Sequence, residues 1–133
     1  MSLKDEALQL GRNAKEAARR LARFSCAEKN RALLRMAERV EGGKKLLLQE
    51  NKKDLELARK ARLSSALLDR IALDPGRIAG MAKGLREVAA LPDPVREIVK
   101  MWRRPNGLQV GKMRIPLGVI GIIYEARPNV TAD

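Results

Sequence analysis

Apolar side chains recur at steps of three and four residues through most of residues 3–90, which is the spacing of one face of an α-helix. Ser25 followed by Glu28 has the pattern of a capping box, so a second helix is predicted to begin at Cys26. The first helix should start near Ser2, and its apolar stripe consists of Leu3, Ala7, Leu10, Ala14, Ala17, Leu21 and Phe24.

Glycine, serine and aspartate mark the ends of the later helices. The pair Gly42-Gly43 costs about 1 kcal/mol per glycine inside a helix, so it should end or bend the second helix. Asp74 followed by Pro75 is a strong start signal, because aspartate caps early N–H groups and proline suits the first helical position. We expect further helices over residues 44–62 and 75–90, and between them a short helix that is capped by Ser64 or Ser65 and runs through Ile71. Pro92 and Pro94 should end the helical pattern.

A β-hairpin is predicted after these prolines. Residues 96–104 and 108–115 flank Pro105-Asn106-Gly107, and Asn-Gly readily takes the positive φ angles of a tight turn. Neither strand presents a fully apolar face, and an isolated two-stranded ribbon is marginal in water. We therefore expect the hairpin to rest on other residues or on a second subunit.

Residues 117–124 are all apolar, glycine or tyrosine, without alternation, which is typical of a strand buried on both faces of a parallel sheet. A parallel partner requires a crossover of about a dozen residues, and only nine follow Tyr124. The expected fold class is α/β, with a helical amino-terminal region, a hairpin, and an early strand of a parallel sheet that other residues must complete. We interpret the sequence as the front end of a larger protein.

The chain is strongly basic, with 28 Lys and Arg against 16 Asp and Glu, a net charge of +12. Such a surplus attracts phosphates, nucleic acid or an anionic membrane. Acidic residues are interleaved with the basic ones, which favours a solvated surface. A helical module that binds nucleic acid is one alternative function, and an oligomerisation module that pairs through the edges of the hairpin is another. Against nucleic-acid binding, the aromatic residues that could stack on bases are only Phe24, Trp102 and Tyr124.

Cys26 is the single cysteine, and the chain has no histidine. One cysteine excludes an internal disulfide and fits the cytoplasm, as does the absence of a leader pattern. Without histidine, Ser-His-Asp triads and zinc clusters are excluded, so we expect Cys26 to be structural and no metal to bind. No apolar run approaches the roughly 18 residues of a membrane span.

The loop at residues 125–131 holds the candidate chemistry, because open α/β sheets bind ligands just past the carboxyl ends of their strands. The Asn129 amide can donate hydrogen bonds to a developing oxyanion, and the Arg127 fork fits a carboxylate or phosphate. A purely structural loop is the alternative. Gly118 and Gly121 do not form the G-x-G-x-x-G fingerprint of dinucleotide sites, and we expect them to allow close packing instead.

The stretch NGLQVGKMRIPLGVIGIIYEARPNVT at residues 106–131 closely resembles the gamma-glutamyl phosphate reductase family of the aldehyde dehydrogenase superfamily, and the helices resemble it more loosely. Members of this family, also called glutamate-5-semialdehyde dehydrogenases, use NADPH to reduce L-glutamyl 5-phosphate to the semialdehyde in proline biosynthesis. The resemblance implies that residues 1–94 are the helical part of a cofactor-binding domain, 95–115 a hairpin arm for homo-oligomer formation, and 116–133 the first part of a Rossmann-type sheet with the active-site loop.

The resemblance also implies roles for single residues. Asn129 matches the asparagine of the superfamily's oxyanion hole, and Tyr124 and Glu125 would form the near edge of the NADP(H) cleft. Arg127 as a binder of substrate phosphate or carboxylate follows from its chemistry alone. The cysteine that forms the thioacyl enzyme lies far downstream in the family and is not matched by Cys26, so we expect these residues alone to be inactive.

Overall fold

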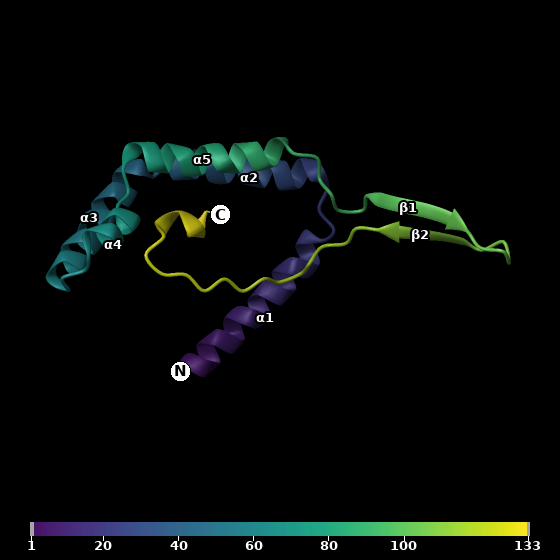
Figure 1. Ribbon diagram of the computed structural model, residues 1–133, viewed down its shortest axis with the longest axis horizontal. Coiled ribbons are helices and arrows are strands. Elements are labelled where there is room, and N and C mark those ends of the chain that lie inside the picture. The colour runs from purple at the N-terminus through teal and green to yellow at the C-terminus, as the bar shows by residue number, and fades with distance from the viewer. Residues whose placement is uncertain (1, 133) are drawn as a thin grey trace. The chain divides into compact units, whose positions relative to one another are not determined.

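The computed structural model describes residues 2–132, which form helices, one two-stranded sheet and a short 3₁₀-helix (Figure 1). The chain divides into two compact units, one of residues 2–26 and 92–121 and the other of residues 27–91 and 122–132. Each unit is described by itself. In chain order the elements are α1 (Leu3–Leu21), α2 (Cys26–Gly42), α3 (Lys44–Lys60), α4 (Ser65–Ile71), α5 (Pro75–Ala90), β1 (Ile98–Arg103), β2 (Gln109–Met113) and η1 (Pro128–Thr131).

Local capping explains most helix starts. In α1 the Ser2 Oγ accepts a hydrogen bond from the Asp5 N–H at 3.2 Å, and the Asp5 carboxylate accepts one from the Ser2 N–H at 3.0 Å. The Ser2 hydroxyl also donates to the Asp5 carboxylate at 2.8 Å, and this bond, followed by the one from the Ser2 N–H, holds the pKa of Asp5 below its ordinary value. In α5 the Asp74 Oδ1 accepts from the Arg77 N–H at 2.7 Å, and Pro75 occupies the first helical position. The predicted starts near Ser2 and at Asp74-Pro75 are confirmed.

The predicted helix boundaries agree with the structure elsewhere too. The second helix begins at Cys26 and ends at Gly42, and Gly43 separates it from α3. Ser64 caps α4 by accepting a hydrogen bond from the Leu67 N–H at 3.4 Å. Helix α3 ends at Lys60, slightly before the predicted end.

The unit of residues 27–91 and 122–132 contains the hydrophobic core. Ala37 of α2 packs against Ala82 and Leu85 of α5, and all three are buried. Ala37 and Ala82 are fully buried at this contact between α2 and α5. Beside this cluster Ile78 is only 1% exposed. Arg86 of α5 reinforces the contact by donating two hydrogen bonds, at 2.7 and 2.6 Å, to the Glu41 carboxylate of α2.

A buried asparagine fixes α3 to the segment between α4 and α5. Asn51, only 5% exposed, donates from Nδ2 to the Ile71 carbonyl at 2.8 Å and accepts at Oδ1 from the Leu73 N–H at 2.7 Å. One side chain thus satisfies two backbone groups that would otherwise be left without partners away from helix ladders. The sequence pattern gave no sign of this contact.

The other unit consists of α1, the hairpin and the extended residues after it. Strands β1 and β2 pair antiparallel, with Trp102 opposite Val110 and a register irregularity between Ile98 and Lys100. At the turn Gly107 has a φ of 85°, as predicted for an Asn-Gly hairpin. No residue of α1 is buried, and neither strand has a buried side chain.

The predicted strand over residues 117–124 is not formed within the described chain. This segment has no regular secondary structure, and Leu117 is 90% exposed while Ile123 is fully exposed. The reason is that a strand requires a neighbouring ladder, and residues 2–132 form only the β1–β2 antiparallel pair. The described residues are therefore mainly helical with one small antiparallel sheet, and the Rossmann-type parallel sheet stays a prediction, as does the division at residues 94 and 115.

No helix within residues 2–132 is long and apolar enough to cross a membrane.

Candidate functional site

The loop of residues 122–132 is closed by a hydrogen bond across its ends. The Tyr124 hydroxyl and the Thr131 Oγ1 lie 2.7 Å apart. Between them Ala126 adopts a φ of 53°, in the left-handed region, and Pro128 starts η1. That conformation costs a non-glycine residue about 1 kcal/mol, and the Tyr124–Thr131 hydrogen bond together with η1 gives the loop a defined structure.

Arg127 and Asn129, the predicted substrate-binding and oxyanion residues, share one cavity. It has a volume of about 420 Å³ and lies between η1 and the α4–α5 connection. Both side chains are exposed, so both are accessible to a ligand. The structure therefore brings these two predicted residues together.

Arg77 lines the same cavity and clamps the α4–α5 connection. Its Nη1 donates to the carbonyls of Asp69 and, at 2.7 Å, of Ala72, and its Nη2 donates to the Asp69 Oδ1 at 2.9 Å. Arg70 is a further lining residue. Sequence reasoning missed Arg70 and Arg77, because only the fold brings α4 and α5 beside residues 127–129.

Tyr124 and Glu125, the predicted cofactor residues, line an adjoining cavity of about 470 Å³. Arg70 and Arg127 line this second cavity as well, together with Asp54 of α3. The two arginines therefore stand at the boundary between the space that holds Asn129 and the space that holds Tyr124 and Glu125.

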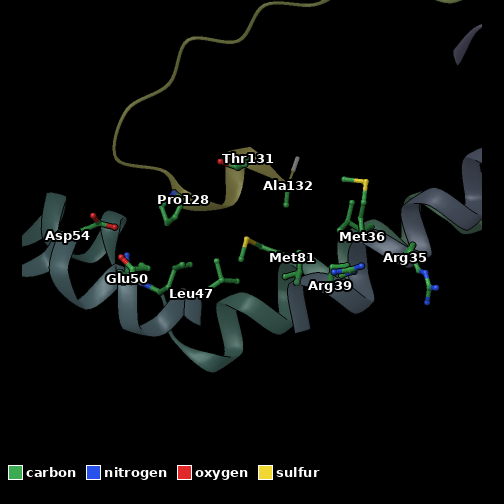
Figure 2. A pocket seen from close by; sticks show the side chains of 14 residues that line it. Arg35, Met36, Arg39, Leu47, Glu50, Asp54, Met81, Pro128, Thr131 and Ala132 are labelled. Carbon is green, nitrogen blue, oxygen red and sulfur yellow. Dashed lines mark hydrogen bonds between the residues drawn. The ribbon is translucent and has the colours of Figure 1, made fainter. Parts of the chain in front are cut away.

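A larger, mainly apolar cavity of about 570 Å³ lies under η1. Figure 2 shows Pro128, Thr131 and Ala132 on one side of it and helix side chains, among them Leu47 and Met81, on the other. This cavity was not predicted as a site, although the apolar stripes of α2, α3 and α5 that line it are visible in the sequence.

Metal binding finds no support among the described residues, since no group of three or more His, Cys, Asp or Glu side chains in residues 2–132 is arranged to hold an ion. Cys26 is exposed at the start of α2. Its structural role stays a prediction.

The sequence relatives and the solved structures that match this chain carry the same name. No protein-family model matches the chain. The gamma-glutamyl phosphate reductases of Geotalea daltonii and Carboxydothermus hydrogenoformans are 56% and 54% identical to it, over 133 and 129 residues. These alignments cover 100% and 97% of this chain but only 32% and 31% of the relatives, so the chain spans about a third of their length.

Solved structures agree with the sequence relatives. The crystal structure of gamma-glutamyl phosphate reductase from Thermotoga maritima matches with a TM-score of 0.90 at 40% identity, over 94% of this chain and 30% of that one. The enzyme of the same name from Saccharomyces cerevisiae matches with a TM-score of 0.84 at 28% identity, over 93% of this chain and 32% of that one. The resemblance read from residues 106–131 is thereby confirmed: over its whole length this chain is homologous to the amino-terminal part of the gamma-glutamyl phosphate reductases.

Proposed function

We propose that this sequence works as the amino-terminal part of a cytoplasmic enzyme that reduces L-glutamyl 5-phosphate to L-glutamate 5-semialdehyde with NADPH, a step of proline biosynthesis. The observation that supports this most is the 56% identity to a gamma-glutamyl phosphate reductase over all 133 residues. The shared cavity of Arg127 and Asn129 adds a physical reason, because it places a cation and an amide donor around one small space.

Each of these two residues has a role in the proposal. The Asn129 amide donates a hydrogen bond to the oxygen that gains negative charge when the acyl carbon becomes tetrahedral. Removing one such donor typically costs about 3 to 4 kcal/mol of transition-state stabilisation. Arg127 holds the anionic end of the substrate through its planar fork. The nucleophilic cysteine of the proposed acyl-enzyme is not Cys26 and lies in the part of the relatives that this chain does not span.

The residues around Tyr124 fit the edge of a nucleotide. Glu125 can accept hydrogen bonds from ribose hydroxyls, and the arginines of the adjoining cavity suit phosphates. The Tyr124 hydroxyl lies 2.7 Å from the Thr131 Oγ1, which positions the tyrosine ring so that its face can contact a ligand. NADPH, when bound, supplies the hydride, while these side chains only orient it.

A chimera tests the proposal. This chain replaces the corresponding residues of the Geotalea daltonii relative, and the reverse reaction is followed by NADPH formation from glutamate semialdehyde, NADP and phosphate. We expect activity in the chimera and none in the 133-residue chain alone. In the chimera, Asn129→Ala should lower kcat by about 100-fold or more.

The matched control is Asn13→Ala, which removes an exposed amide on α1 and should leave kcat unchanged. A folded chimera without activity would contradict the proposal, and so would an Asn129→Ala chimera with unchanged kcat. Activity of the isolated chain would contradict the expectation that these residues are inactive alone.

We also propose that the hairpin of residues 95–115 joins subunits of a homo-oligomer. Its strands are paired only with each other within residues 2–132, and Ile98, Met101 and Trp102 are exposed apolar side chains on β1. Exposed apolar side chains beside an open strand edge favour pairing with a second copy. Light scattering on the chimera with Met101→Lys, against Lys100→Arg as control, should show loss of the oligomer only for the first variant.

A further inference from the structure

Two arginines of the 420 Å³ cavity have no partner for their charge. Arg70 and Arg127 both line it, and within residues 2–132 neither guanidinium makes an ion pair or a hydrogen bond. The lining contains one carboxylate, Asp69, and Arg77 already binds it at 2.9 Å. Within this lining the charges of Arg70 and Arg127 are left without an ion pair, while the carboxylates of Asp54 and Glu125 line the adjoining cavity that both arginines share.

We infer that this cavity is a phosphoryl-binding site in which Arg70 and Arg127 are the two cationic ligands. A phosphoryl dianion matches two positive charges, and guanidinium forks bind phosphate oxygens in pairs. Arg70 is the new residue here, since it comes from α4, far in sequence from the loop that supplies Arg127 and Asn129.

The backbone around Arg70 is held in place before any anion arrives. Arg77 ties down the carbonyls of Asp69 and Ala72, on either side of Arg70. Asn51 binds the Ile71 carbonyl and the Leu73 N–H at 2.8 and 2.7 Å. Apart from Arg70 itself, every residue from 69 to 73 thus has a backbone group that is hydrogen-bonded by the side chain of Asn51 or Arg77. A backbone that is already ordered loses less entropy when the anion binds.

Arg127 is held on the other side by the loop. The Tyr124–Thr131 hydrogen bond at 2.7 Å closes residues 124–131, and Pro128 fixes the backbone immediately after Arg127. The volume of about 420 Å³ lies in the range of small-molecule sites and leaves room beyond a single phosphate ion. The cavity can therefore take a phosphoryl group together with part of the molecule that carries it.

The binding of phosphate stands on this geometry alone. Assigning the anion to the substrate's phosphoryl group rests on the proposed function, and the 2′-phosphate of NADP is the other source of the same chemistry. Arg70 also lines the cavity of Tyr124 and Glu125, so either source can reach it.

Inorganic phosphate is the probe for the 133-residue chain, with binding measured by ³¹P NMR at low ionic strength and helix content by circular dichroism. We expect saturable binding that is weakened about fivefold or more by Arg70→Gln and by Arg127→Gln. Arg59→Gln is the matched control, because Arg59 is an exposed arginine of α3 in the same unit and lines none of these cavities. Absent binding, or equal weakening by all three variants, would overturn the site.

If Arg70→Gln loses helix content, Arg70→Lys replaces it, because lysine keeps the charge and removes only the planar fork. Arg70→Lys should also weaken phosphate binding about fivefold or more. Competition then separates the two sources. Displacement of phosphate by NADP but not by NAD assigns the cavity to the cofactor, and displacement by acetyl phosphate but not by NADP assigns it to the substrate.

The active chimera distinguishes failure of the site from failure of the proposed function. Arg70→Gln should raise the KM for phosphate in the reverse reaction about fivefold or more, while Arg59→Gln leaves it unchanged. An active chimera in which Arg70→Gln leaves the KM for phosphate unchanged would overturn the site and leave the proposed function intact. An inactive chimera together with Arg70-dependent phosphate binding by the chain would overturn the proposed function and leave the site intact.

Discussion

The two compact units of this chain are stabilised in different ways. The unit of residues 27–91 and 122–132 contains buried side chains, with Ile78, Ala37 and Ala82 at its centre, and Asn51 linking α3 to a distant segment. The unit with α1 and the hairpin has no buried side chain in any of its regular elements. One side-chain hydrogen bond between the end of α1 and the hairpin region runs from Arg96 to the Ala22 carbonyl at 3.4 Å. Local signals are thus enough to form helices and a turn, while a core needs contacts between distant residues.

The largest expected difference between the units comes from Ile78→Ala. Removing a side chain that is 1% exposed leaves a cavity and should lower the free energy of unfolding by about 3 kcal/mol. Leu10→Ala on α1 removes a side chain that is 69% exposed and should change it by less than about 0.5 kcal/mol. Urea unfolding followed by circular dichroism measures both. Equal losses of unfolding free energy in Ile78→Ala and Leu10→Ala would contradict the difference in side-chain burial between the two units.

Asn51→Ala tests the buried hydrogen bonds in the same way. It leaves the Ile71 carbonyl and the Leu73 N–H without partners and should cost about 2 kcal/mol. Asn13→Ala is the matched change on α1, where the amide oxygen accepts an exposed bond from Gln9 at 2.8 Å. We expect a cost below about 0.5 kcal/mol there, measured by the same unfolding experiment. A small effect of Asn51→Ala would show that water replaces both bonds.

A pair of backbone substitutions compares one turn in each unit. Gly107→Ala places a side chain at a φ of 85° and should destabilise the hairpin by about 1 kcal/mol or more, although the nearest side-chain atom, on Arg103, leaves room at 3.7 Å. Ala126→Gly relieves a φ of 53° and should be neutral or slightly stabilising. Cross-strand NMR contacts report the first change, and the unfolding midpoint reports the second. Loss of stability in Ala126→Gly would contradict the strain assigned to Ala126.

The smallest expected effect is a pH dependence in the helical unit. Hydrogen bonds from Arg86 hold the pKa of Glu41 below its ordinary value of 4.5. Because this pKa is lower in the folded chain, the contribution of Glu41 is fully present above pH 4.5 and is lost as the pH falls through the folded-state pKa. Glu41→Gln should flatten stability between neutral and acidic pH, measured by melting temperature. Glu56→Gln, outside any ion pair in residues 2–132, is the control, and an identical profile for both would contradict the role of Glu41.

The helices were predictable because single capping residues determine where most of them begin. Ser2, Ser64 and Asp74 each accept a hydrogen bond from the N–H three positions on, so the sequence alone contains the whole interaction. The hairpin followed from Asn106-Gly107 for the same reason. Residues 117–124 have strong strand character, yet a strand depends on a neighbour that no local pattern can supply.

The candidate site was predictable only in part. Arg127 and Asn129 stood out because they follow an apolar run beside a proline, and the structure places them in one cavity. Arg70 and Arg77 lie in a helical stretch where arginine is common, so nothing in their spacing marks them. Their position depends on the α4–α5 connection, which is fixed by Asn51 from another helix.

The uncovered segment at residues 117–124 has a consequence for handling the chain. Val119, Ile120, Ile122 and Ile123 are exposed, and no charged residue interrupts them. Such a stretch can pair with its own kind in neighbouring molecules and stack into amyloid-like sheets. Its nearest gatekeepers are Arg114 and Glu125, one on each side. Concentrated samples should therefore become turbid with time, and Ile120→Lys should delay the rise in turbidity.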